Sequence, residues 1–139
     1  MLEPPRSTEY LGSWENPLGQ YREVVGYSYL GSLFVRDPVK REYLVLHPLN
    51  YGNNARRYGS FDSTAEFESA VLRDAAFVEE ILRPLDLAEL EQRLGSLGPN
   101  QVYFPVPYPL IGGSGELATF QKGNVWVFAD LVGQTLGVG

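Results

Sequence analysis

The pattern of apolar and polar positions divides the chain into two parts that meet near residue 62. The first part contains three runs rich in β-branched and aromatic residues: 23–37 (EVVGYSYLGSLFVRD), 41–48 (REYLVLHP) and 55–61 (ARRYGSF). Runs of this kind, separated by Gly, Pro and Asn, are typical of β-strands. Gly26 and Gly31 interrupt the first run, and we expect bends or bulges there. The pattern therefore predicts three strands joined by short turns in an antiparallel meander.

After residue 62 the apolar residues recur at intervals of three and four, which is the period of an α-helix. Ser63 and Glu66 form a capping box, and this predicts a helix that runs to about Arg73. The stretch 74–82 (DAAFVEEIL) repeats the spacing and predicts a second helix. Because the strands precede the helices, the expected class is α+β: an N-terminal antiparallel β-meander followed by helices packed on one face of the sheet.

A third helix is expected after the break at Pro84, with Asp86 and Glu89 as a second capping pair. Gly95 is placed to end this helix in left-handed geometry. A short strand is expected near 116–120 (ELATF). The last apolar stretch, 125–137 (VWVFADLVGQTLG), fits a strand, a helix, or a strand that runs into a helix.

Residues 1–20 are rich in Pro, Gly, Ser and Asn, and they predict a loosely ordered N-terminal lead-in with Trp14 as its anchor. The remainder, 21–139, is expected to form a single domain, because 139 residues correspond to one domain by the usual relation of length to domain number.

The segment 102–113 (VYFPVPYPLIGG) has three prolines among large apolar residues. Each proline lacks a backbone donor, and each favours extended geometry in the residue before it, so the segment forms neither a helix nor a central strand. Its apolar side chains must be covered by the core or by a partner. We expect Tyr103, Val106 and Leu110 to be buried, and Phe104 and Tyr108 to face outward.

The net charge of −6 is concentrated in one part of the chain. Residues 62–91 contain nine acidic and two basic side chains, a net charge of −7. This disfavours direct binding of nucleic acid, which needs a basic surface, and it favours a basic protein partner. A solvated helix face accounts for the same charges equally well. The predicted partner-binding residues are Glu66, Glu68, Glu79 and Glu80 with the aromatic residues Tyr51, Phe104 and Tyr108.

The sequence offers few residues for catalysis or metal binding. It has no cysteine and only one histidine, His47, which excludes disulfides, thiolate metal sites and a zinc site built on several histidines. His47 has no evident acid–base partner, so we interpret it as structural. We therefore predict a non-enzymatic protein without a metal or cofactor. Since no signal peptide or membrane span is recognisable, the expected location is the cytoplasm.

The second half of the chain, LEQRLGSLGPNQVYFPVPYPLIGGSGELATFQKGNVWVFADLVGQTLG (90–137), resembles the C-terminal domain of bacterial type VI secretion immunity proteins. The upstream stretches GYSYLGSLFVRD, YLVLHP and SFDSTAEFESAVL are similar to the family's strands and first helix. The resemblance covers residues 23–137, and its distinctive part is VYFPVPYPLIGG.

The resemblance implies a non-catalytic protein that binds and neutralises an antibacterial effector toxin delivered by type VI secretion. It implies a nuclease as the effector, an occluded effector active site, and a monomer in a 1:1 complex with a toxin of basic surface. Two alternatives stay open. In the first, the toxin is an NAD-consuming or ADP-ribosylating enzyme instead of a nuclease. In the second, the chain is a small-molecule-binding or enzymatic domain that uses the Gly112–Gly113 segment.

Overall fold

The computed structural model describes residues 1–138 except Glu3 and residues 50–53. Its centre is an antiparallel sheet with the strand order β1-β2-β3-β4-β5. The strands are β1 (Arg6–Ser7), β2 (Glu23–Tyr27), β3 (Leu33–Arg36), β4 (Glu42–Leu46) and β5 (Ala55–Ser60). Neighbours in the sequence are neighbours in the sheet, so the predicted N-terminal antiparallel meander is confirmed.

The first predicted run forms a hairpin of two strands, β2 and β3, rather than one bent strand. Its register shifts between Val24 and Gly26, which places a bulge at the first expected glycine. Gly31 lies in the turn with φ of +93°, and a Cβ there would come within 2.6 Å of the Phe128 ring. A side chain at position 31 is therefore excluded by both backbone conformation and space.

A row of short helices follows the sheet: α2 (Thr64–Phe67), α3 (Ala75–Phe77) and α4 (Pro84–Leu94). The first two continue into single π-helical turns, 68–72 and 78–82. The Ser63 hydroxyl oxygen accepts the backbone N–H of Glu66 at 3.1 Å, as the capping box predicts. In a capping box the Glu66 carboxylate would accept the backbone N–H of Ser63. Here it accepts the N–H of Asp62, one residue earlier.

The predicted capping pair of Asp86 and Glu89 is wrong. The residue before α4 is Arg83, which has a left-handed backbone with φ of +49°, and its guanidinium forms an ion pair with Asp86. Asp86 thus stabilises the helix start through a charge pair and not by accepting a backbone N–H. Gly95 ends α4 as expected, but its φ of +87° and ψ of 171° lie outside the left-handed helical region.

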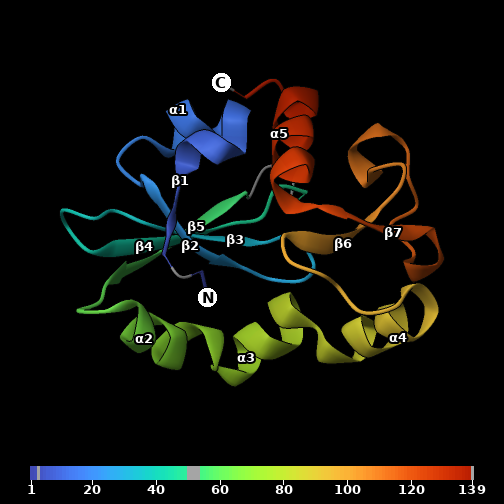
Figure 1. The fold of residues 1–139 in the computed structure, drawn as a ribbon, viewed down its shortest axis with the longest axis horizontal. Coiled ribbons are helices and arrows are strands. Elements are labelled where there is room, and N and C mark those ends of the chain that lie inside the picture. Colours follow the sequence, from blue (N-terminus) through green and yellow to red (C-terminus); the bar gives the residue numbers. More distant parts are fainter. Residues whose placement is uncertain (3, 50–53, 139) are drawn as a thin grey trace.

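Helices cover both faces of the sheet, whereas the sequence predicted one covered face (Figure 1). On one face Phe67 and Val71 pack against Phe34 and Tyr43. On the other face lie the 3-10 helix η1 (Thr8–Trp14), α1 (Glu15–Leu18) and α5 (Val125–Leu136). The second layer forms because β2, β3 and β4 carry apolar residues at both alternating sets of positions. The architecture is a single α+β domain.

Residues 1–20, expected to be a loosely ordered lead-in, form β1, η1 and α1 and contribute to the core. Leu11, Trp14 and Leu18 are buried. The indole N–H of Trp14 donates to the carbonyl oxygen of Ala129 at 2.7 Å, and the N–H of Ser13 donates to the Asp130 carboxylate at 2.9 Å. α5 thus holds η1 in place by hydrogen bonds to Ser13 and Trp14 and by burial of the apolar side chains.

A second, two-stranded sheet pairs β6 (Gln101–Pro105) with β7 (Phe120–Asn124). Most of the expected strand near 116–120 is a 3-10 turn, and the strand begins only at Phe120. At Asn124 the chain turns directly into α5, because the Asn124 side chain accepts the first free N–H groups of that helix. The C-terminal stretch is therefore a helix directly preceded by a strand. No helix among the described residues is long and apolar enough to cross a membrane.

Candidate functional site

The segment with three prolines, 102–113, is called the proline segment below. It begins in strand β6 and lies between α4 and α5 (Figure 1). Tyr103 is buried on the α4 side, as predicted, and its hydroxyl donates to the carbonyl oxygen of Gly95. Phe104 points to the opposite face and stacks on Phe128 of α5, with ring centroids 4.8 Å apart. Both faces of this small sheet are thus covered by helices.

The predicted orientation of the next residues is reversed. Tyr108 packs edge-on against the Phe128 ring at 5.9 Å and is half-buried, as is Phe104. Val106, expected in the core, is 41% exposed. The reason is that α5 supplies an apolar surface for the residues that were expected to face outward. The side chain of Leu110 lies outside what the structure describes.

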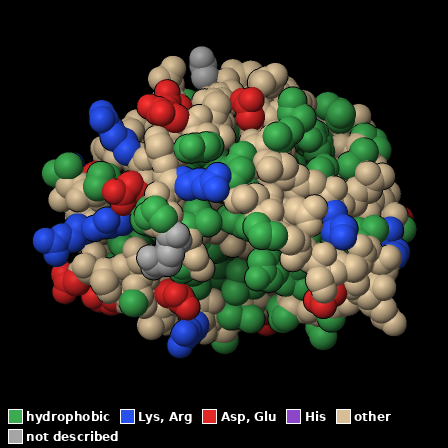
Figure 2. All heavy atoms as spheres, viewed as in Figure 1, with side chains coloured by type: hydrophobic (Ala, Val, Ile, Leu, Met, Phe, Trp, Pro, Cys, Tyr) green, Lys and Arg blue, Asp and Glu red, His purple; other side chains and the backbone are tan. Residues whose placement is uncertain are grey.

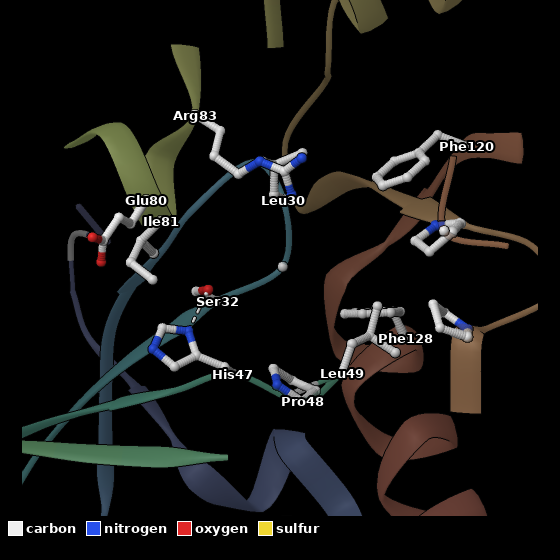
Figure 3. Close-up of a pocket in the computed structure, with 14 residues that line it drawn as sticks. Leu30, Ser32, His47, Pro48, Leu49, Glu80, Ile81, Arg83, Phe120 and Phe128 are labelled. Carbon is white, nitrogen blue, oxygen red and sulfur yellow. Dashed lines mark hydrogen bonds between the residues drawn. The ribbon is translucent and has the colours of Figure 1, made fainter. Parts of the chain in front are cut away.

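A cavity of about 340 Å³ opens between the proline segment, the end of β4 and the helical turn after α3 (Figure 3). Phe120 and Phe128 lie on one side of it, and Glu80 and Ile81 lie on the other (Figure 3). His47 lies between the two sides. The walls combine apolar surface with a few polar groups, which is the usual character of a binding groove.

The His47 ring is held by a hydrogen bond between its Nδ1 and the Ser32 hydroxyl at 2.9 Å (Figure 3). Burial, with the nearby positive charge of Arg56, lowers the pKa of His47 below its ordinary value. The ring is therefore neutral near pH 7. The second ring nitrogen hydrogen-bonds no carboxylate of the described residues, so His47 and Ser32 lack the third member of a catalytic triad.

A second cavity, of about 350 Å³, continues from the first and shares His47, Glu80 and Ile81 with it. Arg56 and Asp74 line its far end. Glu80 thus stands at the border of both cavities, at the edge of the acidic helices. Within the described parts of the chain, no three His, Asp or Glu side chains are close enough together to hold a metal ion.

The four acidic residues predicted for partner binding lie along the helical row. Glu66 and the pair Glu79 and Glu80 are exposed. Glu68 is half-buried and pairs with Arg73 at 3.3 Å. The structure thus places the predicted acids on one helical layer, and only Glu80 borders the groove.

Two of the three aromatic residues predicted for partner binding lie together in the structure. Phe104 and Tyr108 meet on α5, with ring centroids 6.2 Å apart. Tyr51 lies outside the described residues. Sequence reasoning missed Tyr29, which is 56% exposed in the turn between β2 and β3. The sequence did contain a signal for it. Tyr29 stands two positions before Gly31, and a glycine inside a long strand-like run indicates the turn of a hairpin.

Comparisons with known proteins agree with this architecture. Residues 62–135 match the family described as T6SS immunity protein Tdi1, C-terminal. Among solved structures, the crystal structure of Atu4351 from Agrobacterium tumefaciens has a TM-score of 0.60 and 14% sequence identity, covering 92% of this chain and 64% of that chain. That likeness concerns the fold alone, and this chain spans under two thirds of Atu4351. The search of curated proteins found no match.

The family match extends from the capping box of α2 through the helical row and the proline segment to the end of α5. It includes the acidic helices and both strands of the second sheet, and it spans more than half of the sequence. The chain belongs to the family of type VI secretion system immunity proteins defined by the C-terminal domain of Tdi1.

Proposed function

We propose that this protein neutralises a nuclease effector by covering the effector's active site with the acidic helical layer 62–91. The observation that carries the proposal is the net charge of −7 in this stretch, on a layer that lies along one side of the molecule (Figure 1). A nuclease must hold a polyphosphate, so its site is basic. An acidic protein face competes for the same surface.

Most of these carboxylates form no ion pair within the described part of the protein. Three of the nine take part in ion pairs within the protein: Asp62, Glu68 and Asp86. The other six form no ion pair with a described residue: Glu66, Asp74, Glu79, Glu80, Glu89 and Glu91. Exposed charges of one sign accelerate the encounter with a partner of opposite charge.

Tight inhibition also needs a contact from which water is excluded, because rim charges change the association rate more than the affinity. Phe104 and Tyr108 pack on Phe128, which lines the groove that Glu80 borders. With Tyr51, they are the aromatic contacts of this proposal. The protein acts without catalysis or a cofactor, as a monomer in a 1:1 complex in the cytoplasm.

The test uses the effector encoded beside the gene of this chain. The purified effector is incubated separately with plasmid DNA, RNA and NAD, with and without one equivalent of the immunity protein. We expect DNA cleavage that the immunity protein abolishes. Consumption of NAD instead of DNA would overturn the nuclease assignment, and undiminished cleavage in the presence of a folded immunity protein would overturn active-site occlusion.

A further inference from the structure

An apolar pocket lies between the β2–β3 turn and the helical layer. Its cavity measures about 340 Å³, and we call it the Tyr29 pocket. Its apolar lining consists mainly of Tyr27, Tyr29, Phe34, Leu72, Leu82 and Leu87. In Figure 2, hydrophobic side chains gather around a hollow near the centre of the face, above the helical layer. A concave apolar site with an exposed aromatic residue at its edge is typical of an interaction surface.

The turn that carries Tyr29 is held in place by hydrogen bonds. The N–H of Ser28 donates to the carbonyl oxygen of Ser32 at 2.7 Å, and the N–H of Ser32 returns a bond to the Ser28 hydroxyl at 3.0 Å. The carbonyl oxygen of Tyr29 accepts the N–H of Tyr103 at 2.8 Å. Tyr29 is thus an exposed aromatic ring on a fixed backbone, and such a residue loses little conformational entropy when a partner covers it.

The walls of the pocket determine which partner fits. Five lining residues, Glu68, Leu72, Arg73, Leu82 and Leu87, belong to the stretch of net charge −7. Glu68 and Arg73 pair with each other at 3.3 Å, so the negative charge comes from the rest of that stretch. A second copy of the chain would bring another stretch of −7 against the first, and like charges across an interface disfavour association. A partner with basic residues is attracted by the same negative charge.

We propose that the Tyr29 pocket receives an apolar side chain of the effector, flanked in the effector by Lys or Arg. This inference rests on the proposed function, because it takes the neutralised effector as the partner. The cavity is near the lower end of the range for ligand pockets, about 300–1,000 Å³, which suits one or two side chains. Tyr29 and the inserted side chain would form a second desolvated contact beside that of Phe104 and Tyr108, and the acidic helices would form its charged rim.

The experiment measures the dissociation constant of the complex with the effector encoded beside the gene. Tyr29→Ala removes the ring, and Tyr29→Phe keeps it. Tyr10→Ala is the matched control, because Tyr10 is 57% exposed and lies on η1 beside Trp126, on the other side of the sheet. We expect Tyr29→Ala to weaken binding at least about 30-fold, mainly through faster dissociation. Tyr29→Phe and Tyr10→Ala should stay within about fivefold of the wild type.

The outcomes separate this inference from the function on which it rests. If the wild type binds the effector and Tyr29→Ala binds equally well, the pocket is overturned and the function stands. If the wild-type chain does not bind the effector, both are overturned. If Tyr29→Ala abolishes self-association in sedimentation and leaves effector binding unchanged, a second copy is the occupant, and the effector assignment is wrong.

Discussion

The ring of Phe104 lies nearly parallel to the ring of Phe128, with an interplanar angle of 22° and centroids 4.8 Å apart. This stacked pair joins the proline segment to α5. Phe128 also fills the space left by Gly31, so the pair connects the small sheet with the β2–β3 turn.

Removing that ring tests the connection. Phe104→Ala should lower the free energy of unfolding by about 1–3 kcal/mol, less than a fully buried phenylalanine, because Phe104 is only half-buried. The control is Val106→Ala, two residues further along the segment, which should change stability by less than about 0.5 kcal/mol. Urea denaturation of both variants provides the comparison. Equal losses would mean that the stacked pair does not stabilise the segment.

Leu44→Ala tests the core between the large sheet and the N-terminal helices. Leu44 is 5% exposed in the middle of β4, and truncation should cost about 2–4 kcal/mol through the cavity that it leaves. Val39→Ala, at an 86% exposed position in the turn before β4, is the control and should be nearly neutral. The measurement is a pair of denaturation curves with the same slope. An unchanged midpoint for Leu44→Ala would contradict the assigned core.

Reversing Glu79 and Glu80 to lysine should slow association with the effector several-fold. The reason is electrostatic steering, and the effect should fade with salt because the Debye length falls from about 10 Å at 0.1 M to about 3 Å at 1 M. Reversal of Glu9 and Glu15, on η1 and α1 across the sheet, makes the same change in net charge and is the control. Stopped-flow kinetics at two salt concentrations measure both pairs. If the two double variants slow association equally, only the net charge matters, and the helical layer has no special role.

Stability should depend on pH through Asp130. Hydrogen bonds from the backbone N–H and the hydroxyl of Ser13 hold the pKa of Asp130 below its ordinary value. Because this pKa is lower in the folded protein than in the unfolded chain, the added stability is present above the unfolded value, about 3.9, and is lost as the pH falls toward the folded value.

Ser13→Ala should therefore destabilise the protein near neutral pH and lose part of its effect in strong acid. The remainder comes from the bond of the Ser13 hydroxyl to the carbonyl oxygen of Asp130, which does not depend on the carboxylate charge. The exposed Ser69, which forms no side-chain hydrogen bond with a described residue, provides the control Ser69→Ala. Thermal denaturation of both variants across the acid range measures the difference. A gap between wild type and Ser13→Ala that stays constant down to about pH 2 would show that the Ser13 hydroxyl does not stabilise the Asp130 charge.

Local signals in the sequence predicted much of the fold. Alternating β-branched residues marked the strands, and Ser63 gave the start of α2, because a strand period and a cap depend on neighbouring residues alone. The left-handed backbone at Arg83 was not predictable in this way, since a non-glycine residue adopts that conformation only under tertiary constraint. The order within residues 1–20 also depends on distant partners in α5.

The candidate site was less predictable for the same reason. Predicting that Phe104 and Tyr108 face inward would have required the knowledge that α5 crosses the small sheet. No pattern within the proline segment contains that information. The acidic residues were proposed because charge density is visible in the sequence. Which of them borders the groove depends on how the helices pack in three dimensions: Glu80 lies at its border, and Glu66 lies on α2.

The contacts of Ser13 and Trp14 with residues 129 and 130 join positions 115 to 117 residues apart in the sequence. One face of the large sheet is therefore incomplete until α5 has been synthesised, and a ribosome-bound chain that ends before residue 125 exposes the apolar side chains of that face. Contacts at such separations slow folding, because a long loop must close before they form. A cell that makes this protein against a toxin already present has to synthesise α5 before any copy of the domain is complete.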